Sequence, residues 1–497
     1  MAKYIGITLG PIGDTMSLTS TPAGLWAASY LFSFLAHEIR RGIGKEGLLQ
    51  DDYEYKPGFT VRSLYEKGVG LYHDRIIYEA DEIHDLDNAY IAVKNAVDTV
   101  IDGFAVSDAI KTEKANIKDF FERYLNIHIV CMDIEDNENF LFKINDVLDA
   151  AELEKSFPTV LSQKNPVLAL FEGKEDNRNA AIKTSFLMAR KNDNVIMLHD
   201  SERRIKDLPS IAAAVENSPY KNNEKALRYY AVIRADGDNM GAAIKKITNE
   251  ADYHDFSRRC FDYGCKTAET VLRYCGIPIY VGGDDLLCIS PLMVGNKDEE
   301  ALTFLDMIRE IRDGFKQIFP EGDLSFGVQI QYVKAPLYEA LDRSGGLLFG
   351  TAKSNKPGAV AINIQKHSGQ SAETLMKYST VEGEKVCDQV NRLIKMHASE
   401  ETLKSVGKHI SDFSVLFNCA GQGGEDKLEN FFKNVFDNGV SDSDRNYLNK
   451  INTLANLIIN AAESEKRKID PAEEIGAYIR LIKFFSEKLI DEEEAVK

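Results

Sequence analysis

One run of segments, between residues 228 and 365, limits the fold more than any other feature of this sequence. Strand-like stretches alternate with helix-like stretches in the order strand, helix, two strands, helix, strand. This order predicts a ferredoxin-like or palm arrangement with a central hairpin. The expected strands are 229–235, 277–281, 286–290 and 324–333, and the expected helices are 252–275 and 299–319; a helix at 336–350 and a strand at 359–364 follow.

Two acidic motifs lie at strand ends that this topology places side by side. The first is Asp236-Gly237-Asp238-Asn239-Met240-Gly241, and the second is Gly282-Gly283-Asp284-Asp285 in the central hairpin. Transfer of a nucleotidyl group is stabilised by two divalent ions roughly 4 Å apart. Carboxylates are the ligands that Mg²⁺ (or Mn²⁺) prefers. We therefore expect Asp236, Asp284 and Asp285 to be catalytic metal ligands, with the carbonyl group of Gly237 completing one shell.

The same motifs predict contacts with a nucleotide. Gly282 and Gly283 permit a tight turn and let a phosphate approach the backbone. The stretch Gly237, Asp238, Asn239, Met240 and Gly241 precedes a helix, whose N-terminal amides favour a triphosphate. Lys353 follows the helix at 336–350 and is expected to neutralise the β- and γ-phosphates. Taken alone, each acidic motif is more simply interpreted as an ordinary turn, and Lys353 as a surface lysine. The occurrence of all three features together favours a metal site.

The remaining sequence divides into further parts, so that the expected fold class is α+β, with two palm domains, a connector and a C-terminal α-helical bundle. Residues 1–165 read as a first palm, 166–225 as a connector with a helix at 178–190 and a strand at 195–198, 226–366 as the second palm, and 367–497 as the helical part. Within the first palm, strands are expected at 3–10, 70–79 and 126–133, and helices at 22–41 and 88–123.

Composition narrows the class of function. A net charge of −18 argues against bulk nucleic-acid binding, since phosphate neutralisation needs clustered Lys and Arg. Seven scattered cysteines indicate a reduced, cytoplasmic protein without a disulfide framework or a zinc ribbon. No apolar run is long enough to span a bilayer, and the first residues have no signal-peptide layout. We expect a cytoplasmic protein that contacts no membrane.

The sequence resembles a known family, the large polymerase/cyclase subunit of type III CRISPR effector complexes. Within that family it is most similar to the Cmr (III-B) branch. The resemblance rests on YAVIRADGDNMG (230–241), YVGGDDLLCI (280–289), Ala352-Lys353 and the N-terminal stretch 10–39. It implies synthesis of cyclic oligoadenylates from ATP when the complex binds target RNA. It also implies partner subunits, with the CRISPR RNA and the target RNA bound mainly through them.

The resemblance further implies two palms that face each other, of which only the second is catalytic. The first palm agrees, because its corresponding turn offers only Asp14 and no Asp-Asp hairpin. Ser17, Thr19 and Ser29 are candidates to contact a ribose or a phosphate there, although helix capping or packing is the commoner role of such residues.

Two departures from the family pattern matter. Many members of the family begin with an HD nuclease domain, which we do not expect here. The dipeptides His73-Asp74, His84-Asp85, His199-Asp200 and His254-Asp255 are dispersed, so we interpret them as structural. The zinc-binding cysteines between the palms are also missing. Some nuclease-less members couple ATP to S-adenosylmethionine as a co-substrate to give an AMP conjugate, and this alternative stays open. The other hypotheses for the function are a diguanylate-cyclase-like enzyme and a non-catalytic RNA-complex scaffold.

Overall fold

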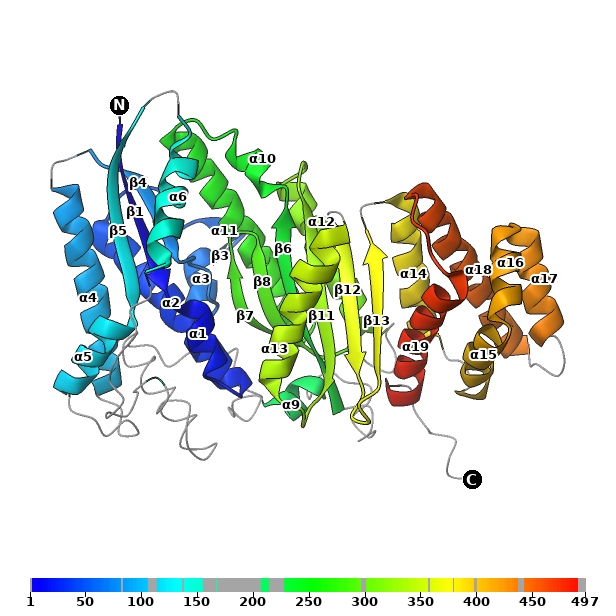
Figure 1. Cartoon of the computed structure of the whole chain (residues 1–497). Helices are drawn as coiled ribbons and strands as arrows, with labels where there is room; N and C mark the ends of the chain where they lie inside the picture. The colour runs from blue at the N-terminus through cyan, green and yellow to red at the C-terminus, as the bar shows by residue number, and fades with distance from the viewer. Residues whose placement is uncertain are drawn as a thin grey trace.

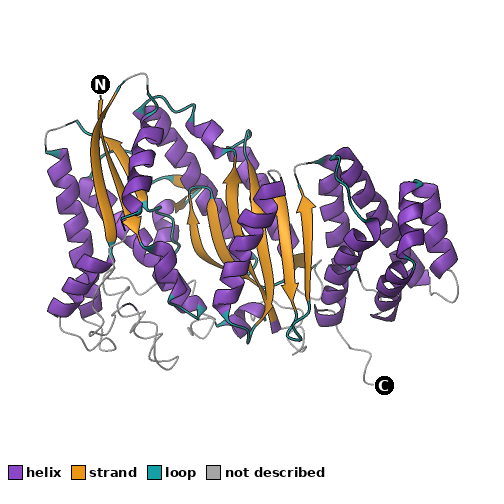
Figure 2. Ribbon diagram, viewed as in Figure 1, coloured by secondary structure: helices purple, strands orange, loops and turns teal. Residues whose placement is uncertain are grey.

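The computed structural model describes residues 2–81, 84–105, 114–135, 138–154, 167, 207–213, 228–295, 301–355, 358–378, 380–396, 400–436 and 442–489. Within these ranges, an N-terminal sheet, a six-stranded sheet and a helical bundle follow one another along the molecule (Figure 1). Helices flank both sheets, and the part after the last strand contains only helices (Figure 2). The helix expected at 178–190 and the strand expected at 195–198 lie outside the described residues.

The N-terminal part is built on a three-stranded antiparallel sheet with the order β4-β1-β5. The long helix α2 begins where Thr21 accepts the N–H of Gly24, 3.2 Å away, with Pro22 at its first position, and ends before Gly44, whose φ is 71°. The elements are β1 (Ala2–Gly10), α1 (Ile12–Ser17), α2 (Pro22–Ile43), β2 (Glu54–Lys56), β3 (Phe59–Thr60), α3 (Val61–Tyr65), β4 (Arg75–Glu79), α4 (Asp85–Ala105), α5 (Lys114–Tyr124), β5 (Asn126–Ile134) and α6 (Phe140–Glu152).

Part of the expected strand 70–79 has another role. Only Arg75–Glu79 pairs with β1, whereas the carbonyl group of Gly70 accepts the N–H of Val281, 3.1 Å away, at the edge of the second sheet. Among the described residues, the N-terminal sheet therefore has the three expected strands, of which β4 is shorter than expected, and the chain before β4 joins the two sheets. The expected helix 88–123 is described as α4 and α5, with residues 106–113 outside the described ranges.

The second sheet has the order β13-β12-β11-β6-β8-β7, with β11 and β12 parallel and the other pairs antiparallel. The four neighbouring strands β11-β6-β8-β7 have the expected palm order. Helix α13 crosses the front of the sheet in Figure 1. The elements are α9 (Leu208–Ala212), β6 (Tyr229–Asp238), α10 (Met240–Ile244), α11 (Glu250–Arg273), β7 (Ile277–Gly282), β8 (Asp285–Ser290), β9 (Met293–Val294), β10 (Leu302–Thr303), α12 (Phe304–Ile318), β11 (Asp323–Tyr332), α13 (Leu337–Gly346), the π-helix η3 (Leu347–Ala352), the short η4 (Lys353–Asn355), β12 (Ala359–Gln365) and β13 (Ser371–Lys377).

Two elements differ from expectation. Helix α12 starts at Phe304 because Thr303 and Asp306 form a capping box. Strand β13 lies in sequence that reads as helical, and it extends the sheet beyond β12. Its residue Lys377 forms a buried ion pair with Glu465 of the bundle, with 3.0 Å between Nζ and Oε2. Strand β13 and the ion pair between Lys377 and Glu465 therefore connect the sheet to the helical part.

The C-terminal part is a bundle of six described helices, as the periodicity of residues 446–462 and 473–490 predicts. They are α14 (Val381–Lys395), α15 (Glu400–Asp412), α16 (Ser414–Gln422), α17 (Glu425–Phe436), α18 (Asp442–Ser464) and α19 (Pro471–Leu489). One hydrophobic core, which begins at Ile5 and ends at Phe485, passes through all three parts. Among the described residues, no helix combines the length and the apolar character that crossing a membrane requires.

Candidate active site

The first acidic motif lies at the end of β6, in the middle of the second sheet. The strand continues three residues beyond the expected 229–235, and Asp236, Gly237 and Asp238 pair in register with the start of β11. Since side chains alternate along a strand, Asp236 and Asp238 lie on the same face of the sheet. The strand itself, rather than a loop, therefore fixes these two carboxylates.

The second motif forms the turn between β7 and β8. Gly283 has a φ of 64°, which a side chain disfavours, and Gly282 pairs with Asp285 across the turn. The turn brings Asp284 against the backbone of Gly237, so that a Cβ atom at position 237 would lie 2.5 Å from Asp284 Oδ2. The structure thus brings the two motifs together, and glycine at position 237 is required by this contact.

The carboxyl groups of the turn lie close to one another and are partly shielded from water. Burial raises the pKa of Asp285 to about 7, and the nearby Asp284 and Asp74 act in the same direction, against Arg234. Burial also raises the pKa of Asp284, although N–H groups of the backbone, including that of Gly237, oppose the rise. Desolvated carboxylates with little compensating positive charge favour the binding of a cation.

A cation of the chain itself occupies part of this region. Lys353 forms an ion pair with the carboxylate of Asp236, and its Nζ atom donates a hydrogen bond of 3.0 Å to the carbonyl oxygen of Gly237. Nζ also lies 3.6 Å from Asp238 Oδ1. The ammonium group therefore lies against the same oxygen atoms that the sequence assigns to a metal ion. The π-helix η3 ends directly before Lys353 and sets its position.

Other residues of the first motif have structural contacts. Asp238 accepts hydrogen bonds from Ser325 Oγ, 2.6 Å away, and from the N–H of Gly358, 2.8 Å away. This carboxylate therefore ties β6 to β11 and β12 rather than being open to a nucleotide. Asn239 has a φ of 63°, and Met240 and Gly241 begin α10. This helix has only five residues, so its dipole contributes little to anion binding.

The N-terminal part contributes one acidic residue to the surroundings of the turn, although its sequence context predicted a structural role. Asp74 is half-buried, and its charge acts on Asp285 and on Tyr280 of β7. Its neighbour Arg75 is held in place because Arg40 Nη2 donates to the Arg75 carbonyl oxygen, 2.8 Å away. The only sequence signal was the His-Asp dipeptide, which gave no indication of a contact across the two sheets.

The polar residues proposed for the first palm make local contacts. Ser17 Oγ donates to the carbonyl oxygen of Asp14, 2.7 Å away, and Thr19 bonds the backbone of Thr21. The buried hydroxyl group of Ser29 has no hydrogen-bond partner within the described residues. Capping and packing, the commoner roles, therefore account for Ser17 and Thr19.

A divalent ion fits the donor set at the two motifs. The oxygen atoms of Asp236 and Gly237 already accept a cation, Lys353, and Asp284 and Asp285 are carboxyl groups that burial makes difficult to ionise without one. In the described ranges, no three His, Cys, Asp or Glu side chains are close enough to form one complete shell. Backbone carbonyl groups and water would supply the remaining ligands, as is usual for Mg²⁺.

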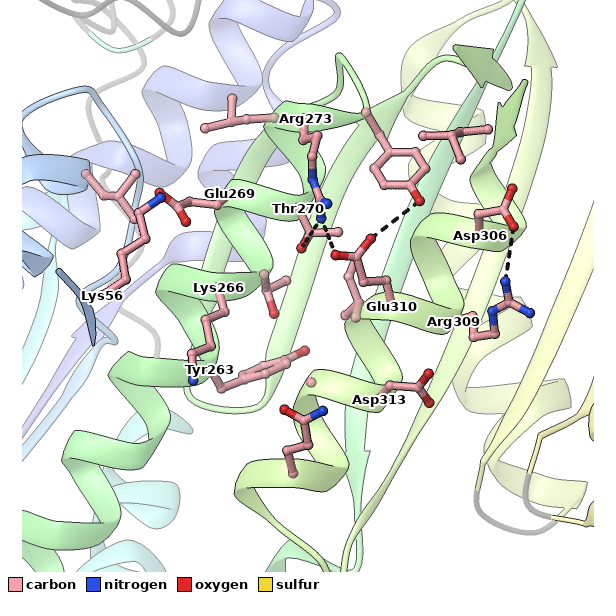
Figure 3. Close-up of a pocket in the computed structure, with 18 of the residues that line it drawn as sticks. Lys56, Tyr263, Lys266, Glu269, Thr270, Arg273, Asp306, Arg309, Glu310 and Asp313 are labelled. Atoms are coloured by element: carbon pink, nitrogen blue, oxygen red, sulfur yellow. Dashed lines mark hydrogen bonds and ion pairs between the residues drawn. The ribbon is translucent and has the colours of Figure 1, made fainter. Parts of the chain in front are cut away.

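A cavity of about 920 Å³ lies elsewhere, between α11, α12 and the segment around β2 and α3 (Figure 3). None of the aspartates of the two acidic motifs lines it, and neither does Asp74. Its charged side chains largely neutralise one another, because Lys56 lies 2.5 Å from Glu269, Arg273 bonds Glu310, and Arg309 lies near Asp306. We assign no ligand to this cavity.

Comparison with known proteins identifies the sheet that carries the motifs. Residues 229–361 match the family described as Cas10/Cmr2, second palm domain. The CRISPR system Cmr subunit Cmr2 of Pyrococcus furiosus is 29% identical over 198 aligned residues, which cover 33% of this chain and only 22% of that protein.

Two solved structures extend the likeness in fold to most of the chain. A chain of the Csm1–Csm4 cassette in complex with cA4 superposes with a TM-score of 0.54 at 12% identity, covering 97% of this chain and 69% of the other. A chain of the type III-B Cmr-beta complex in its apo state gives a TM-score of 0.54 at 12% identity, over 83% of this chain and 75% of the other. Residues 229–361, which contain both acidic motifs, therefore match a Cas10/Cmr2 second palm domain, and most of the chain shares the fold of these solved type III CRISPR subunits.

Proposed function

We propose that this protein is an ATP-dependent nucleotidyltransferase that makes a cyclic oligoadenylate second messenger within a type III CRISPR complex. The observation that carries the proposal is the contact between Asp284 and Gly237, which joins the two acidic motifs in one site. A cassette of similar fold, Csm1–Csm4, has been solved in complex with cA4 and in complex with pppApA.

The proposed mechanism assigns a role to each group of the site. Asp236, Asp284, Asp285 and the carbonyl group of Gly237 would hold Mg²⁺ or Mn²⁺, which when bound stabilises the charge on the attacking and leaving oxygen atoms. Lys353 turns from Asp236 to the β- and γ-phosphates of ATP. Gly283, where a Cβ atom would meet no atom within 4 Å, leaves room for the triphosphate next to the backbone.

The proposed partners are the other subunits of the complex, together with the CRISPR RNA and the target RNA that they hold. The net charge of −18 favours RNA contact through those subunits rather than through this chain. The structures of similar fold were solved as a Csm1–Csm4 cassette and as a Cmr-beta complex, which supports assembly with other subunits.

One observation favours a second candidate function, adenylyl transfer from ATP to S-adenosylmethionine. The carboxyl group of Asp74 in the N-terminal part acts on Asp285, while Arg75 and Arg40 act on Asp74, so this region presents charges of both signs. The carboxyl group would attract an acceptor with positive charge. The sulfonium and ammonium groups of S-adenosylmethionine carry such charge.

One experiment separates these functions. The protein, alone and assembled with its partner subunits and target RNA, is incubated with α-labelled ATP and Mg²⁺, with S-adenosylmethionine or GTP added to parallel reactions. We expect a labelled oligoadenylate in RNA-bound samples. A labelled product that requires S-adenosylmethionine would establish the second candidate, and one that requires GTP would establish a diguanylate-cyclase-like enzyme.

The variant Asp284→Ala with Asp285→Ala serves as the test of the site. It is expected to form no product while it still assembles, whereas Asp412→Asn, an exposed carboxyl group on α15, retains full activity. Unchanged turnover in the double variant would refute the site. Absence of any product from the wild-type complex would support the hypothesis of a non-catalytic RNA-complex scaffold.

A further inference from the structure

The outer strands of the two main sheets differ in how their free edges are covered. These strands are β13 and β7 in the six-stranded sheet, and β4 and β5 in the N-terminal sheet. Tyr478 donates to the Leu375 carbonyl oxygen of β13, 2.7 Å away, and Gly70 pairs with β7. An unpaired edge attracts other strands, so natural proteins cover or blunt it. Both edges of the six-stranded sheet carry such a contact.

The edge of β4 is covered as well. The carbonyl oxygen of Arg75 accepts from Arg40, that of Glu79 accepts from Lys45, and the N–H of Glu79 donates to Glu250 Oε1, 3.4 Å away. These bonds come from α2, from the segment after it and from α11. Three of the four outer strands are therefore tied to other parts of the chain.

The register shows which groups of β5 point outward. The N–H of Ala80 donates to the carbonyl oxygen of Lys3, so odd-numbered residues of β1 face β4 and even-numbered residues face β5. Each even-numbered residue of β1 is paired with an even-numbered residue of β5, as Tyr4 is with Met132. Even-numbered residues of β5 therefore bond to β1. The outward N–H and C=O groups belong to Ile127, Ile129, Cys131 and Asp133. Within the described residues, no group bonds to them.

The sequence of β5 does not blunt this edge. Its nine residues contain no proline and no lysine, and its register with β1 runs from Gly10 to Ala2 without a bulge. Cys131 and Asp133 are exposed, so the second half of the edge is accessible. A long, regular and largely apolar edge of this kind favours strand addition by another polypeptide.

Charge indicates the kind of polypeptide. Asp133 and the exposed Glu135 lie at the accessible end of β5, and the register partner of Asp133 on β1 is the exposed Lys3, which forms no salt bridge with it. A second copy of this chain would bring another net charge of −18 and an identical acidic end. We propose that the edge of β5 binds an extended segment of a neighbouring subunit of the complex, with a Lys or Arg residue opposite Asp133. This inference rests on the proposed assembly with other subunits.

The test compares three variants in the assembled complex. Cys131→Pro removes one outward N–H and leaves the ladder with β1 intact, while Cys131→Ser keeps that N–H and is the matched control. Asp133→Lys reverses the charge at the accessible end. We expect Cys131→Pro to weaken subunit association by about fivefold, since it removes the donor of one hydrogen bond between strands. Asp133→Lys also weakens it, and Cys131→Ser does not.

Amide hydrogen exchange supplies a readout that a folding defect does not reproduce. In the wild-type complex, the amides of Ile129, Cys131 and Asp133 are expected to exchange more slowly than in the free chain, and the thermal unfolding of the free Cys131→Pro variant should match that of Cys131→Ser. If the complex forms while these amides remain unprotected and Cys131→Pro associates normally, the edge is not the binding surface and the proposed function stands. If no complex forms at all, both proposals fail.

Discussion

Lys353 and Asp236, which lie 117 positions apart in the sequence, form an ion pair beside the carbonyl oxygen of Gly237. The lysine approaches from the end of η3 and the aspartate from the end of β6. A side-chain cation therefore balances the charge of the first acidic motif, and it must give way when a divalent ion binds there. This competition leads to the first prediction.

Lys353→Met is expected to raise the KM for ATP by about tenfold, because a point charge that contacts the β- and γ-phosphates is lost. The same change is expected to tighten Mg²⁺ binding, since the competing ammonium group is gone. Steady-state kinetics and a Mg²⁺ titration followed by thermal unfolding measure the two effects. Lys334→Met, at an exposed lysine after β11, is the control. Weaker Mg²⁺ binding in Lys353→Met would contradict the competition.

Gly237→Ala is expected to abolish product formation. A Cβ atom there would contact Asp284 Oδ2 at 2.5 Å and would push the turn that carries Asp284 and Asp285 away from β6. Gly241→Ala is the matched control, because a Cβ atom at position 241 meets no other atom within 4 Å. Activity and far-ultraviolet circular dichroism should be measured on both variants. Equal activity of the two variants would show that the contact between the motifs has no catalytic role.

The pKa of Asp285 predicts how stability depends on pH in the metal-free protein. Its folded-state value of about 7 lies above the ordinary value of 3.8, so the folded protein holds a proton that the unfolded chain releases in this interval. The contribution of this group to the free energy of unfolding therefore falls as pH rises from about 4 to about 7 and is constant above. Asp285→Asn should raise the Tm at pH 8 in EDTA and change it little near pH 4.

Mg²⁺ should remove this difference in the wild-type protein, because a bound cation compensates the ionised carboxyl groups. At pH 8, added Mg²⁺ is thus expected to raise the Tm of the wild type more than that of Asp285→Asn. The same increase in both proteins would place the metal ion elsewhere.

The buried pair of Arg312 and Asp323 predicts a large effect on stability. Arg312 donates two hydrogen bonds, of 2.7 and 2.8 Å, to Asp323 at the start of β11, beside Asp238 in the register. Arg312→Leu removes both side-chain hydrogen bonds of the Asp323 carboxylate and leaves only Lys316 Nζ, 3.6 Å away, as a nearby cation. It should cost about 3 kcal/mol, measured by urea unfolding, whereas Arg312→Leu with Asp323→Leu should recover most of the loss.

The exposed pair of Arg123 and Asp119 is the control for this measurement. Because solvent screens it, Arg123→Leu should cost less than about 1 kcal/mol. Similar losses in Arg123→Leu and Arg312→Leu would show that burial does not determine the effect.

The sequence predicts the palm strands well because their apolar residues form short, regular runs between turn residues. It does not predict β13, whose sequence SAETLMK is half polar because the strand lies at a sheet edge and is completed by the bundle. The partners of Asp238 are likewise out of reach of sequence patterns, since Ser325 and Gly358 are 87 and 120 positions away. The nearness of Asp74 to Asp285 depends on the packing of two sheets, which no local pattern encodes.

The uninterrupted core has a consequence for how the molecule comes apart. Apolar side chains from Ile5 to Phe485 touch in one cluster, so each part shields side chains of the next. A protease that cuts a surface loop would then leave the fragments associated, and calorimetry should record one endotherm rather than three. Mechanical load on the last helix would reach the six-stranded sheet through packed side chains.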